Sequence, residues 1–476
     1  MRQLNTAMLL LACLLNLFSC NPKPEEISPT PTLTPVLPVQ VWTTSANGTS
    51  LLSSKTVGFA TGKDERFPVI QIDTAQQFQT VDGFGFTLTG GSAALLHQMG
   101  QTERAALLRE FFGTDTKGIG VSYLRLSMGA SDLDAEVFSY DDLPAGQTDP
   151  DLLRFNLSKD TLHLIPVLKE ILAINPKIKL MASPWSAPTW MKTNHNSVGG
   201  NLKQEYYPAY ARYFVKYIQA MQSRGMAIDA VTIQNEPQHG GNNPSMVMSF
   251  VQQAEFIKNH LGPAFQAAGL STKIVVWDHN CDNPAYPMAV LADPAANAFV
   301  AGSAFHLYGG DISALSQVHN AYPDKALYFT EQWTGSTGQF EGDFKWHVKN
   351  VIIGSMRNWS RTALEWNLAN DPNFGPHTPG GCTQCRGAVT INGSNASKNV
   401  SYYIVGQASK GVPPGSVRLG SSGADALQHV AFKTPTGKKA LIVLNDGAAL
   451  VSFNIHCNGK WIVSSLGAGT AATFVW

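Results

Sequence analysis

The sequence has no surplus of charge of either sign. Its 476 residues include 34 Lys and Arg against 34 Asp and Glu, and charged residues make up only 14% of the chain. Such a balance gives no electrostatic reason to bind nucleic acid or an anionic membrane surface. The hydrophobic content of 44% is enough for one large core and a smaller one. We therefore expect a folded protein that binds a neutral partner and no nucleic acid.

The apolar run near the N-terminus is too short to remain in a membrane as a span. Arg2 precedes "MLLLACLLNLF", and the following "LFSC" ends at Cys20. This arrangement is typical of an export signal, and "LFSC" resembles the lipobox of bacterial lipoproteins, whose last cysteine is lipidated. We expect residues 1–20 to be a lipoprotein signal peptide. The alternative is an ordinary signal peptide with a chance cysteine.

Residues 21–40 are rich in Pro and Thr, a composition that predicts an extended linker. The expected product is an exported bacterial lipoprotein, attached by its lipid to the outer membrane, on the periplasmic face or at the cell surface. Its contact with the membrane would be through that anchor alone. We expect a monomer.

Clusters of metal-ligating side chains are missing from the sequence. The 12 histidines are scattered without the spacing of a metal site, so we expect no metal. Of the six cysteines, Cys382 and Cys385 form "CTQC" without a second pair, which favours a local disulfide over zinc. Cys281 and Cys457 would also meet an oxidising compartment, and their pairing stays open.

Between about residues 80 and 370, short β-rich runs alternate with amphipathic stretches long enough for helices. This alternation predicts parallel βα units rather than a sandwich. Pro208 to Gly225, for example, has an apolar stripe at helical spacing and Gly225 as a stop. Eight such units that close on themselves form a (β/α)8 TIM barrel, an α/β fold. The predicted strands are 81–88, 121–127, 178–183, 228–236, 273–278, 299–306, 325–331 and 361–367.

After Gly411 the pattern changes to alternating strand-like runs, with a turn-like "TPTGKK" between two of them. The strand-like segment from Val39 to Ile72 can join these runs, so that both ends of the chain build one side β-sandwich. The predicted boundaries are 41–78 for the N-terminal strands, 79–410 for the barrel and 411–476 for the C-terminal part of the sandwich.

Polar residues gather at the ends of the predicted strands, where a TIM barrel places its active site. Asn235 and Glu236 end the fourth strand, and Glu331 ends the seventh. Two such carboxylates suit glycoside hydrolysis, in which one is acid and base while the other attacks the anomeric carbon. A structural alternative is that Glu236 caps a helix and Glu331 pairs with Arg125. Four tryptophans nearby can stack on sugar rings: Trp185, Trp190, Trp333 and Trp366.

These motifs together resemble glycoside hydrolase family 30, the family of glucosylceramidases and microbial β-1,6-glucanases. "TIQNEP" matches the acid/base motif of the family and "FTEQW" its nucleophile motif. "SPWSAPTWMKTN" and "LEWNLA" match its sugar-stacking segments, and "FHLY" its sixth strand. The resemblance covers nearly all of the chain after the linker. It implies a retaining enzyme with a barrel, a side β-sandwich and no cofactor.

The resemblance also implies roles for single residues. Glu236 would be the acid/base, with a pKa raised by the nearby charge of Glu331. Glu331 would be the nucleophile, kept ionised by Arg125 or by a hydrogen bond from Tyr308. Asn235 would hold the 2-hydroxyl of the sugar. The remaining candidates for substrate binding are Trp185, His306, Trp333 and Trp366.

One position departs from the family pattern. Where many members have an Asp that holds the outer hydroxyls of glucose, this chain has Gly90 in "GFGFTLTGGSA". We expect this loss to open the pocket into a cleft that accepts chains from within. The sequence therefore favours a lipid-anchored endo-β-1,6-glucanase. The alternatives are an exo-acting β-glucosidase, β-xylosidase or glucosylceramidase-like enzyme, and, from another class, a non-catalytic glycan-binding lipoprotein of the cell surface.

Overall fold

The computed structural model describes residues 38–115 and 117–476. The predicted signal peptide, the lipidation site at Cys20 and most of the predicted linker lie outside these residues and stay predictions. Within the described part of the chain, no helix is both long and apolar enough to cross a membrane.

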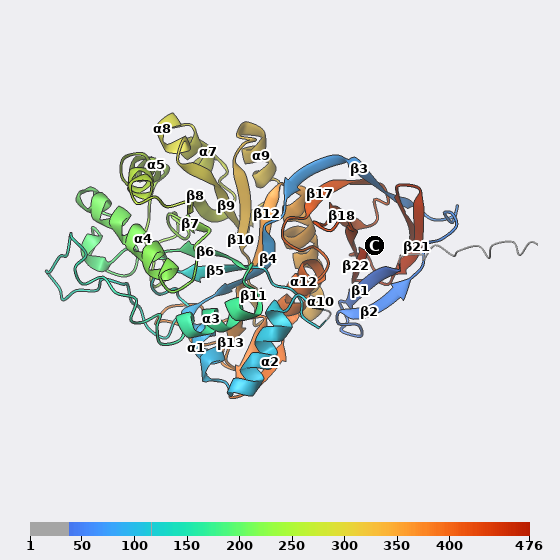
Figure 1. Ribbon diagram of the computed structural model, residues 1–476, viewed down its shortest axis with the longest axis horizontal. Coiled ribbons are helices and arrows are strands. Elements are labelled where there is room, and N and C mark those ends of the chain that lie inside the picture. Colours follow the sequence, from blue (N-terminus) through green and yellow to red (C-terminus); the bar gives the residue numbers. More distant parts are fainter. Residues whose placement is uncertain (1–37, 116) are drawn as a thin grey trace, which may run out of the picture. The chain divides into compact units, whose positions relative to one another are not determined.

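Eight parallel strands form a closed barrel in which each strand pairs with the next one along the chain (Figure 1). All eight strands predicted from the sequence are present, so the barrel prediction is confirmed. Their order in the barrel is that of the chain, with β12 closing onto β4. The strands are β4 (Gly83–Leu88), β5 (Tyr123–Ser127), β6 (Lys179–Ser183), β7 (Ala230–Thr232), β8 (Lys273–Cys281), β9 (Val300–Gly310), β10 (Ala326–Glu331) and β12 (Ser360–Asn367).

Helices follow the strands, as the βα pattern predicts. Pro208 stands in the first turn of α4, and Gly225 follows its end with a φ of +83°, which suits glycine as a stop. The helices are α1 (Gly90–Gln98), α2 (Gln101–Phe112), α3 (Leu164–Ile174), η1 (Thr189–Met191), η2 (Gln204–Tyr206), α4 (Tyr207–Gln222), α5 (Phe250–Phe256), η3 (Ile257–Leu261), α6 (Gly262–Ala267), α7 (Ala285–Leu291), α8 (Pro294–Asn297), α9 (Ala314–Ala321), α10 (Phe340–His347), η4 (Val348–Gly354), α11 (Ser355–Arg357) and α12 (Val400–Ser409).

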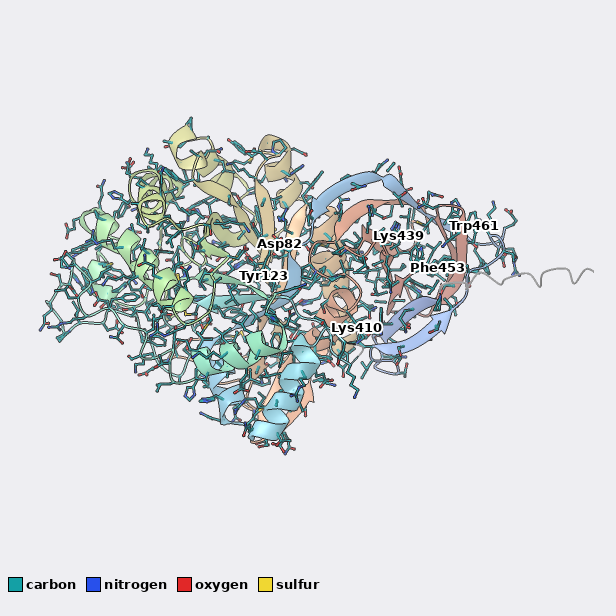
Figure 2. All side chains as sticks on the ribbon, viewed as in Figure 1. Asp82, Tyr123, Lys410, Lys439, Phe453 and Trp461 are labelled. Carbon is teal, nitrogen blue, oxygen red and sulfur yellow. A yellow bond between two sulfur atoms is a disulfide. The ribbon has the colours of Figure 1, made fainter. Side chains whose placement is uncertain are left out.

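The inside of the barrel is filled by side chains at its amino-terminal half. A buried cluster takes one residue from each of seven strands, from Tyr123 on β5 to Leu364 on β12. Just before β4 lies Asp82, which is labelled in Figure 2. It accepts hydrogen bonds from Lys179, the first residue of β6, and from Arg361 near the start of β12. Since this end is closed by packing and ion pairs, a ligand must bind at the carboxyl ends of the strands.

A second sheet of nine strands uses both ends of the described chain, as predicted. Its strand order is β2-β1-β22-β19-β18-β17-β3-β20-β21. Its core includes Phe474 and Phe453, the second of which is labelled in Figure 2. The strands are β1 (Val39–Ser45), β2 (Ser53–Val57), β3 (Val69–Thr80), β17 (Val417–Ser422), β18 (Gln428–Lys433), β19 (Lys439–Asn445), β20 (Val451–Cys457), β21 (Lys460–Leu466) and β22 (Thr470–Val475).

The predicted boundary between linker and sheet is wrong by two residues. Val39 and Gln40 fall in the predicted linker, but they already pair in β1, where Val39 is fully buried and faces Val57. The sheet also keeps β3 up to Thr80, two residues beyond the predicted limit of 78. Burial of Val39 outweighs the Pro-rich composition of the residues before it.

Two small sheets involve the segment that follows the last barrel strand, β12, and one of them also uses β11, which lies between β10 and β12 in the chain. β11 pairs with β14, and β15 pairs with both β13 and β16. This segment contains Cys382 and Cys385, which are joined in a disulfide. Cys281 and Cys457 are buried and free. The small strands are β11 (Thr334–Gly335), β13 (Ala369–Asn370), β14 (Cys385–Arg386), β15 (Val389–Asn392) and β16 (Asn395–Lys398).

Candidate active site

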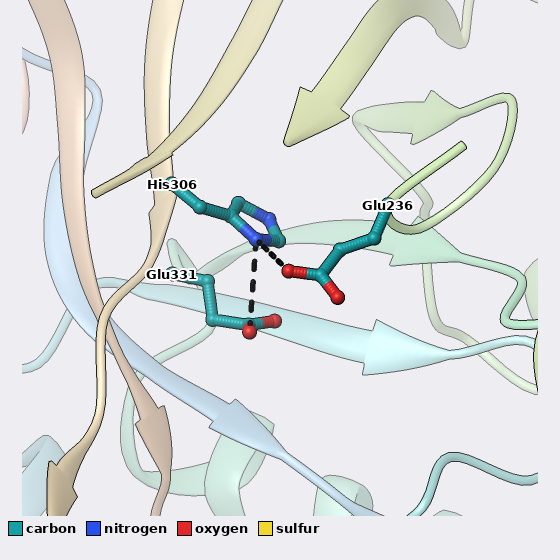
Figure 3. A group of neighbouring side chains, drawn as sticks. All are labelled: Glu236, His306 and Glu331. Atoms are coloured by element: carbon teal, nitrogen blue, oxygen red, sulfur yellow. Dashed lines mark hydrogen bonds and ion pairs between the residues drawn. The ribbon is translucent and has the colours of Figure 1, made fainter. Parts of the chain in front are cut away.

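Glu236 and Glu331 meet at the carboxyl end of the barrel. Glu331 is the last residue of β10, and Glu236 lies four residues beyond the end of β7. His306 on β9 lies between them: its Nδ1 is 3.2 Å from Glu236 Oε1 and 3.7 Å from Glu331 Oε1 (Figure 3). One carboxylate oxygen of each glutamate and this nitrogen all lie within 4.8 Å of one another.

The backbone around Glu236 is held in an unusual conformation. Glu236 has a φ of +48°, in the left-handed region that few residues other than glycine adopt. Its N–H donates to the carbonyl of Asp278, and its own carbonyl accepts from the N–H of His239. These two bonds fix a turn after β7 that points the carboxylate at His306.

Glu331 is held by two donors. Arg125 Nη1 donates to its Oε2 at 2.5 Å, and the hydroxyl of Tyr308 donates to its Oε1 at 3.0 Å. Burial raises the pKa of Glu331 above its ordinary value, and the charges of His306 and Arg125 oppose this rise. Both donors favour the ionised carboxylate, as the sequence predicted for Arg125 and Tyr308.

The sequence analysis missed Asp278, a fully buried carboxylate within β8. It accepts hydrogen bonds from Arg125 Nη2 at 2.8 Å and from the hydroxyls of Ser183, Thr232 and Thr330. His306 Nε2 lies 3.1 Å from its other oxygen. Burial would raise the pKa of Asp278, but Arg125 and His306 hold it far below its ordinary value.

Asp278 therefore orients Arg125 and His306, two of the groups that contact the glutamates. Its partners come from five barrel strands, so it ties the carboxyl end of the barrel together. A signal was present in the sequence, because Asp278 ends the predicted strand 273–278 as Glu331 ends another.

His306 is expected to be protonated at neutral pH. Burial alone would lower its pKa, but the charge of Glu331 and the hydrogen bonds to Asp278 and Glu236 raise it to about 9. The protonated His306 also affects the pKa of Glu236. Burial would raise the pKa of Glu236, but the hydrogen bond and charge of His306 outweigh it and lower the pKa. The predicted rise of the Glu236 pKa is thus wrong, because His306 contributes more than Glu331.

A pocket of about 350 Å³ opens above the two glutamates. On one side, Trp185 and Trp366 pack in a hydrophobic cluster with Leu133 and Cys385, against which Trp333 and Cys382 also lie. Asp132 is the further acidic residue that lines the pocket. Besides the two glutamates, the other lining residues have polar side-chain groups: Asn235, His239, Asn242, His279, Asn280 and Tyr308. The pocket can therefore offer rings that stack on a sugar and groups that form hydrogen bonds.

Two family models match this chain over separate ranges. Residues 81–412 match the model described as the glycosyl hydrolase family 30 TIM-barrel domain, and residues 415–474 match the family 30 beta sandwich domain. The chain belongs to glycoside hydrolase family 30. Together the two matches cover the barrel and the C-terminal strands of the sheet, so this chain is a glycoside hydrolase by family.

Several named members of family 30 are similar over most of their length. The endo-1,6-beta-D-glucanase neg1 of Aspergillus fumigatus is 35% identical over 412 residues, which are 80% of this chain and 82% of that protein. The putative glucosylceramidase 4 of Caenorhabditis elegans is 30% identical over 442 residues, which are 87% of this chain and 83% of that protein. The solved structure of the endo-beta1,6-glucanase BT3312 has a TM-score of 0.87 and 35% identity, and the match covers 92% of this chain and 99% of that one.

The structure separates the family 30 site residues predicted from the sequence into two groups. Asn235, Tyr308, Trp185, Trp333 and Trp366 line the pocket beside the two glutamates. Arg125 and His306 are fully buried behind the glutamates instead, where they contact carboxylates rather than the pocket. Arg125 Nη2 donates to the amide oxygen of Asn235 at 2.6 Å, which leaves the amide nitrogen of Asn235 as a donor for a ligand.

Trp190 does not take part in the pocket, in contrast to the prediction. Its ring packs edge-on against Tyr206, and its Nε1 donates to the carbonyl of Asp141 at 3.0 Å. The side chain is only 4% exposed. Trp190 is thus a packing residue of the loop after β6, because its one polar atom already has a partner.

The opening expected at Gly90 is also wrong. A Cβ atom built on Gly90 would lie 1.7 Å from Oδ1 of Asp134, so the space for a side chain there is already filled. Asp134 is held by the N–H and hydroxyl of Ser131. Gly90 is required by this close approach of the neighbouring loop, and it does not widen the pocket.

Glu236, His306 and Glu331 are close enough together to ligate a metal ion. The charge state argues for another use of the group. A metal ion would have to displace the proton of His306, whose pKa is raised to about 9 by Glu331, Asp278 and Glu236. Arg125 also places a positive charge against Glu331. The arrangement suits proton transfer between His306 and Glu236 better than it suits a cation.

We expect the stability of the protein to depend on the protonation of His306. Its pKa of about 9 in the fold exceeds the ordinary 6.5, so its contribution is complete below pH 6.5 and is lost as the pH rises through 9. The shift corresponds to about 3 kcal/mol. Urea unfolding at pH 6 and pH 9.5 should show this loss in the wild type and a much smaller one in His306→Gln. Parallel losses in the two proteins would contradict it.

Proposed function

We propose that this chain is a retaining endo-β-1,6-glucanase that works by double displacement. The observation that carries the mechanism is the short separation of the two glutamates, of which one oxygen each lies within 4.8 Å of the other. Retaining enzymes have carboxyl groups about 5 to 5.5 Å apart, whereas inverting enzymes need about 6.5 to 9.5 Å to admit a water molecule.

Glu331 is the proposed nucleophile. Arg125 and Tyr308 each direct a donor at one of its oxygens, which stabilises the charged carboxylate against the effect of burial and fixes its direction. Its attack on the anomeric carbon forms a covalent glycosyl-enzyme and consumes the charge. Asn235 lies beside it and donates to the 2-hydroxyl of the sugar, as the family resemblance implies.

Glu236 is the proposed acid and base. It shares a proton with His306 Nδ1 across 3.2 Å, so the proton it gives to the leaving oxygen can be taken from that nitrogen. In the second step Glu236 accepts a proton from the attacking water, and a proton passes from Glu236 back to His306. This exchange lets a carboxyl group with a lowered pKa act as an acid.

The choice of a β-1,6-linked glucan rests on the relatives. The endo-1,6-β-glucanases of Aspergillus fumigatus, Trichoderma harzianum and Neurospora crassa are 34–35% identical to this chain, against 29–30% for the glucosylceramidases. The non-catalytic alternative is disfavoured because both glutamates are present and held by dedicated partners.

A product profile on polymers tests this function. We expect linear β-1,6-glucan to be cut into a mixture of short oligosaccharides from the first minutes, with little cleavage of β-1,3- or β-1,4-glucans. The new reducing ends should first appear as the β-anomer by NMR, because two inversions give retention. Release of glucose alone would favour the exo-acting alternative, and first appearance of the α-anomer would rule out double displacement.

A further inference from the structure

Lys192 is a fully buried lysine in the loop between β6 and α4. It directly follows η1, and its N–H donates to the carbonyl of Thr189 at 3.1 Å. Burial lowers the pKa of its ammonium group to about 7, and no neighbouring carboxylate of the described chain offsets this effect. A buried amine without a charged partner needs neutral hydrogen-bond acceptors instead.

Three such acceptors surround the ammonium group of Lys192, and they come from three different segments. Nζ donates to Oγ of Ser186 at 2.8 Å, to the carbonyl of Ser197 at 3.1 Å and to the carbonyl of Ser245 at 2.7 Å. An ammonium group has three N–H donors, so each donor has one acceptor. A single atom therefore joins three segments that are separate in the sequence.

The acceptor Ser245 belongs to the segment 237–248, which directly follows Glu236. His239 and Asn242 of this segment line the catalytic pocket. The N–H of His239 donates to the carbonyl of Glu236 at 2.8 Å, so the segment begins beside the acid. Because Glu236 protonates the leaving oxygen in the proposed mechanism, we place the leaving sugar on this side of the pocket.

The acceptor Ser186 lies in another loop and is the neighbour of Trp185, which lines the same pocket. Lys192 thus joins a loop that offers a ring for stacking to the segment that begins beside the acid. Among the hydrogen bonds of the described residues, the carbonyl of Ser245 accepts only the one from Lys192. Without the ammonium group this buried carbonyl would lack a donor, so the segment 237–248 would have to move.

We propose that Lys192 is a positioning residue for the leaving sugar: its ammonium group holds the segment 237–248, with His239 and Asn242, at a fixed distance from the loop of Trp185. This inference rests on the proposed function. Lys192 donates no hydrogen bond to either catalytic glutamate, so it acts through the two loops. Its effect should therefore fall on substrates whose leaving group reaches the segment 237–248.

The test compares two substrates in the variant Lys192→Met, which removes the donors and keeps an apolar stem. Linear β-1,6-glucan has a sugar as its leaving group. In β-glucosyl fluoride the leaving group is a single atom, too small to reach His239 and Asn242 from the anomeric carbon. We expect a loss of about 10- to 100-fold in kcat/KM on the glucan and of less than about threefold on the fluoride.

Lys203→Met is the matched control. Lys203 lies on the same loop, but its Nζ is 3.1 Å from Nε2 of His195 and donates to no residue of the segment 237–248. We expect this variant to keep the activity of the wild type on both substrates. Equal losses of Lys192→Met on glucan and fluoride would overturn the proposal, because a general weakening of the fold acts on both. An unchanged kcat/KM on the glucan would overturn it too.

Hydrogen exchange followed by mass spectrometry tests the structural step directly. Peptides that cover the segment 237–248 should exchange faster in Lys192→Met than in the wild type and in Lys203→Met. Unchanged exchange in this segment would contradict the positioning role.

A second variant serves if Lys192→Met does not fold. Ser186→Ala removes one acceptor of the three, so we expect a loss of about two- to fivefold in kcat/KM on the glucan and none on the fluoride. Equal losses on both substrates would again overturn the proposal. If the wild type does not cleave β-1,6-glucan, the proposed function fails too; if it does and the two substrates lose equally, only the inference on Lys192 fails.

Discussion

Glu331→Gln should abolish hydrolysis of every β-glucoside, with a loss of at least about 10⁴-fold in kcat. The amide cannot attack the anomeric carbon, so no glycosyl-enzyme forms and a good leaving group gives no rescue. The measurement is initial rate on β-1,6-glucan and on 2,4-dinitrophenyl β-glucoside. Activity within about tenfold of the wild type would remove Glu331 from the role of nucleophile.

We expect the Glu331→Gln variant to keep its fold, although the side chain of Glu331 is buried. Glu331 is only 6% exposed and pairs with Arg125. The amide oxygen introduced by the substitution would still accept a hydrogen bond from Arg125, whose charge remains paired with Asp278 at 2.8 Å. A circular dichroism spectrum and melting temperature close to those of the wild type are therefore the control for the loss of activity.

Glu236→Gln should act on some substrates far more than on others. On β-1,6-glucan, whose leaving group is a sugar alkoxide, we expect a loss of about 10²- to 10⁴-fold, the usual contribution of a general acid. On the dinitrophenyl glucoside the first step needs no proton, so the burst of dinitrophenolate should keep a rate near that of the wild type. The second step should be slow, because the base for water is missing.

Two measurements separate this outcome from a general loss of structure. Pre-steady-state absorbance follows the burst, and mass spectrometry of the quenched protein detects the glycosyl-enzyme that accumulates on Glu331. Azide should restore turnover and yield a β-glucosyl azide, since it needs no base. Equal losses on both substrates, without a burst, would contradict the assignment of Glu236 as acid and base.

The sequence predicted the parts of the site that depend only on the regular alternation of strands and helices. Glu236 and Glu331 are found at strand ends because each strand of a parallel barrel delivers its last residues to the same rim. The eight strands themselves follow from short apolar runs separated by helical periods. These features are local, and the barrel brings them together without further information.

Other parts of the site depend on contacts that no local pattern reports. Asp132 and Asp134 lie on a long loop whose course is set by Gly90 and by the segment around Cys382. The direction of the Glu236 pKa could not be predicted because it depends on His306, whose own charge depends on Asp278 and Glu331. Trp190 was predicted to stack on a sugar, because the sequence does not show that its indole N–H donates a hydrogen bond to the carbonyl of Asp141.

The position of β22 in the nine-stranded sheet has a consequence for synthesis of the protein. β22 lies between β1 and β19 and pairs with both along six residues each. β1 is made first among the strands of this sheet, but it can pair with β22 only after β22, the last of them, has been made. The barrel lies between these strands in the sequence, so it can close earlier. A chain that stops before Thr470 would leave β1 and β19 with unpaired edges, the kind of surface at which nascent chains aggregate. Loss of β22 would thus give a misassembled product rather than a slightly shorter enzyme.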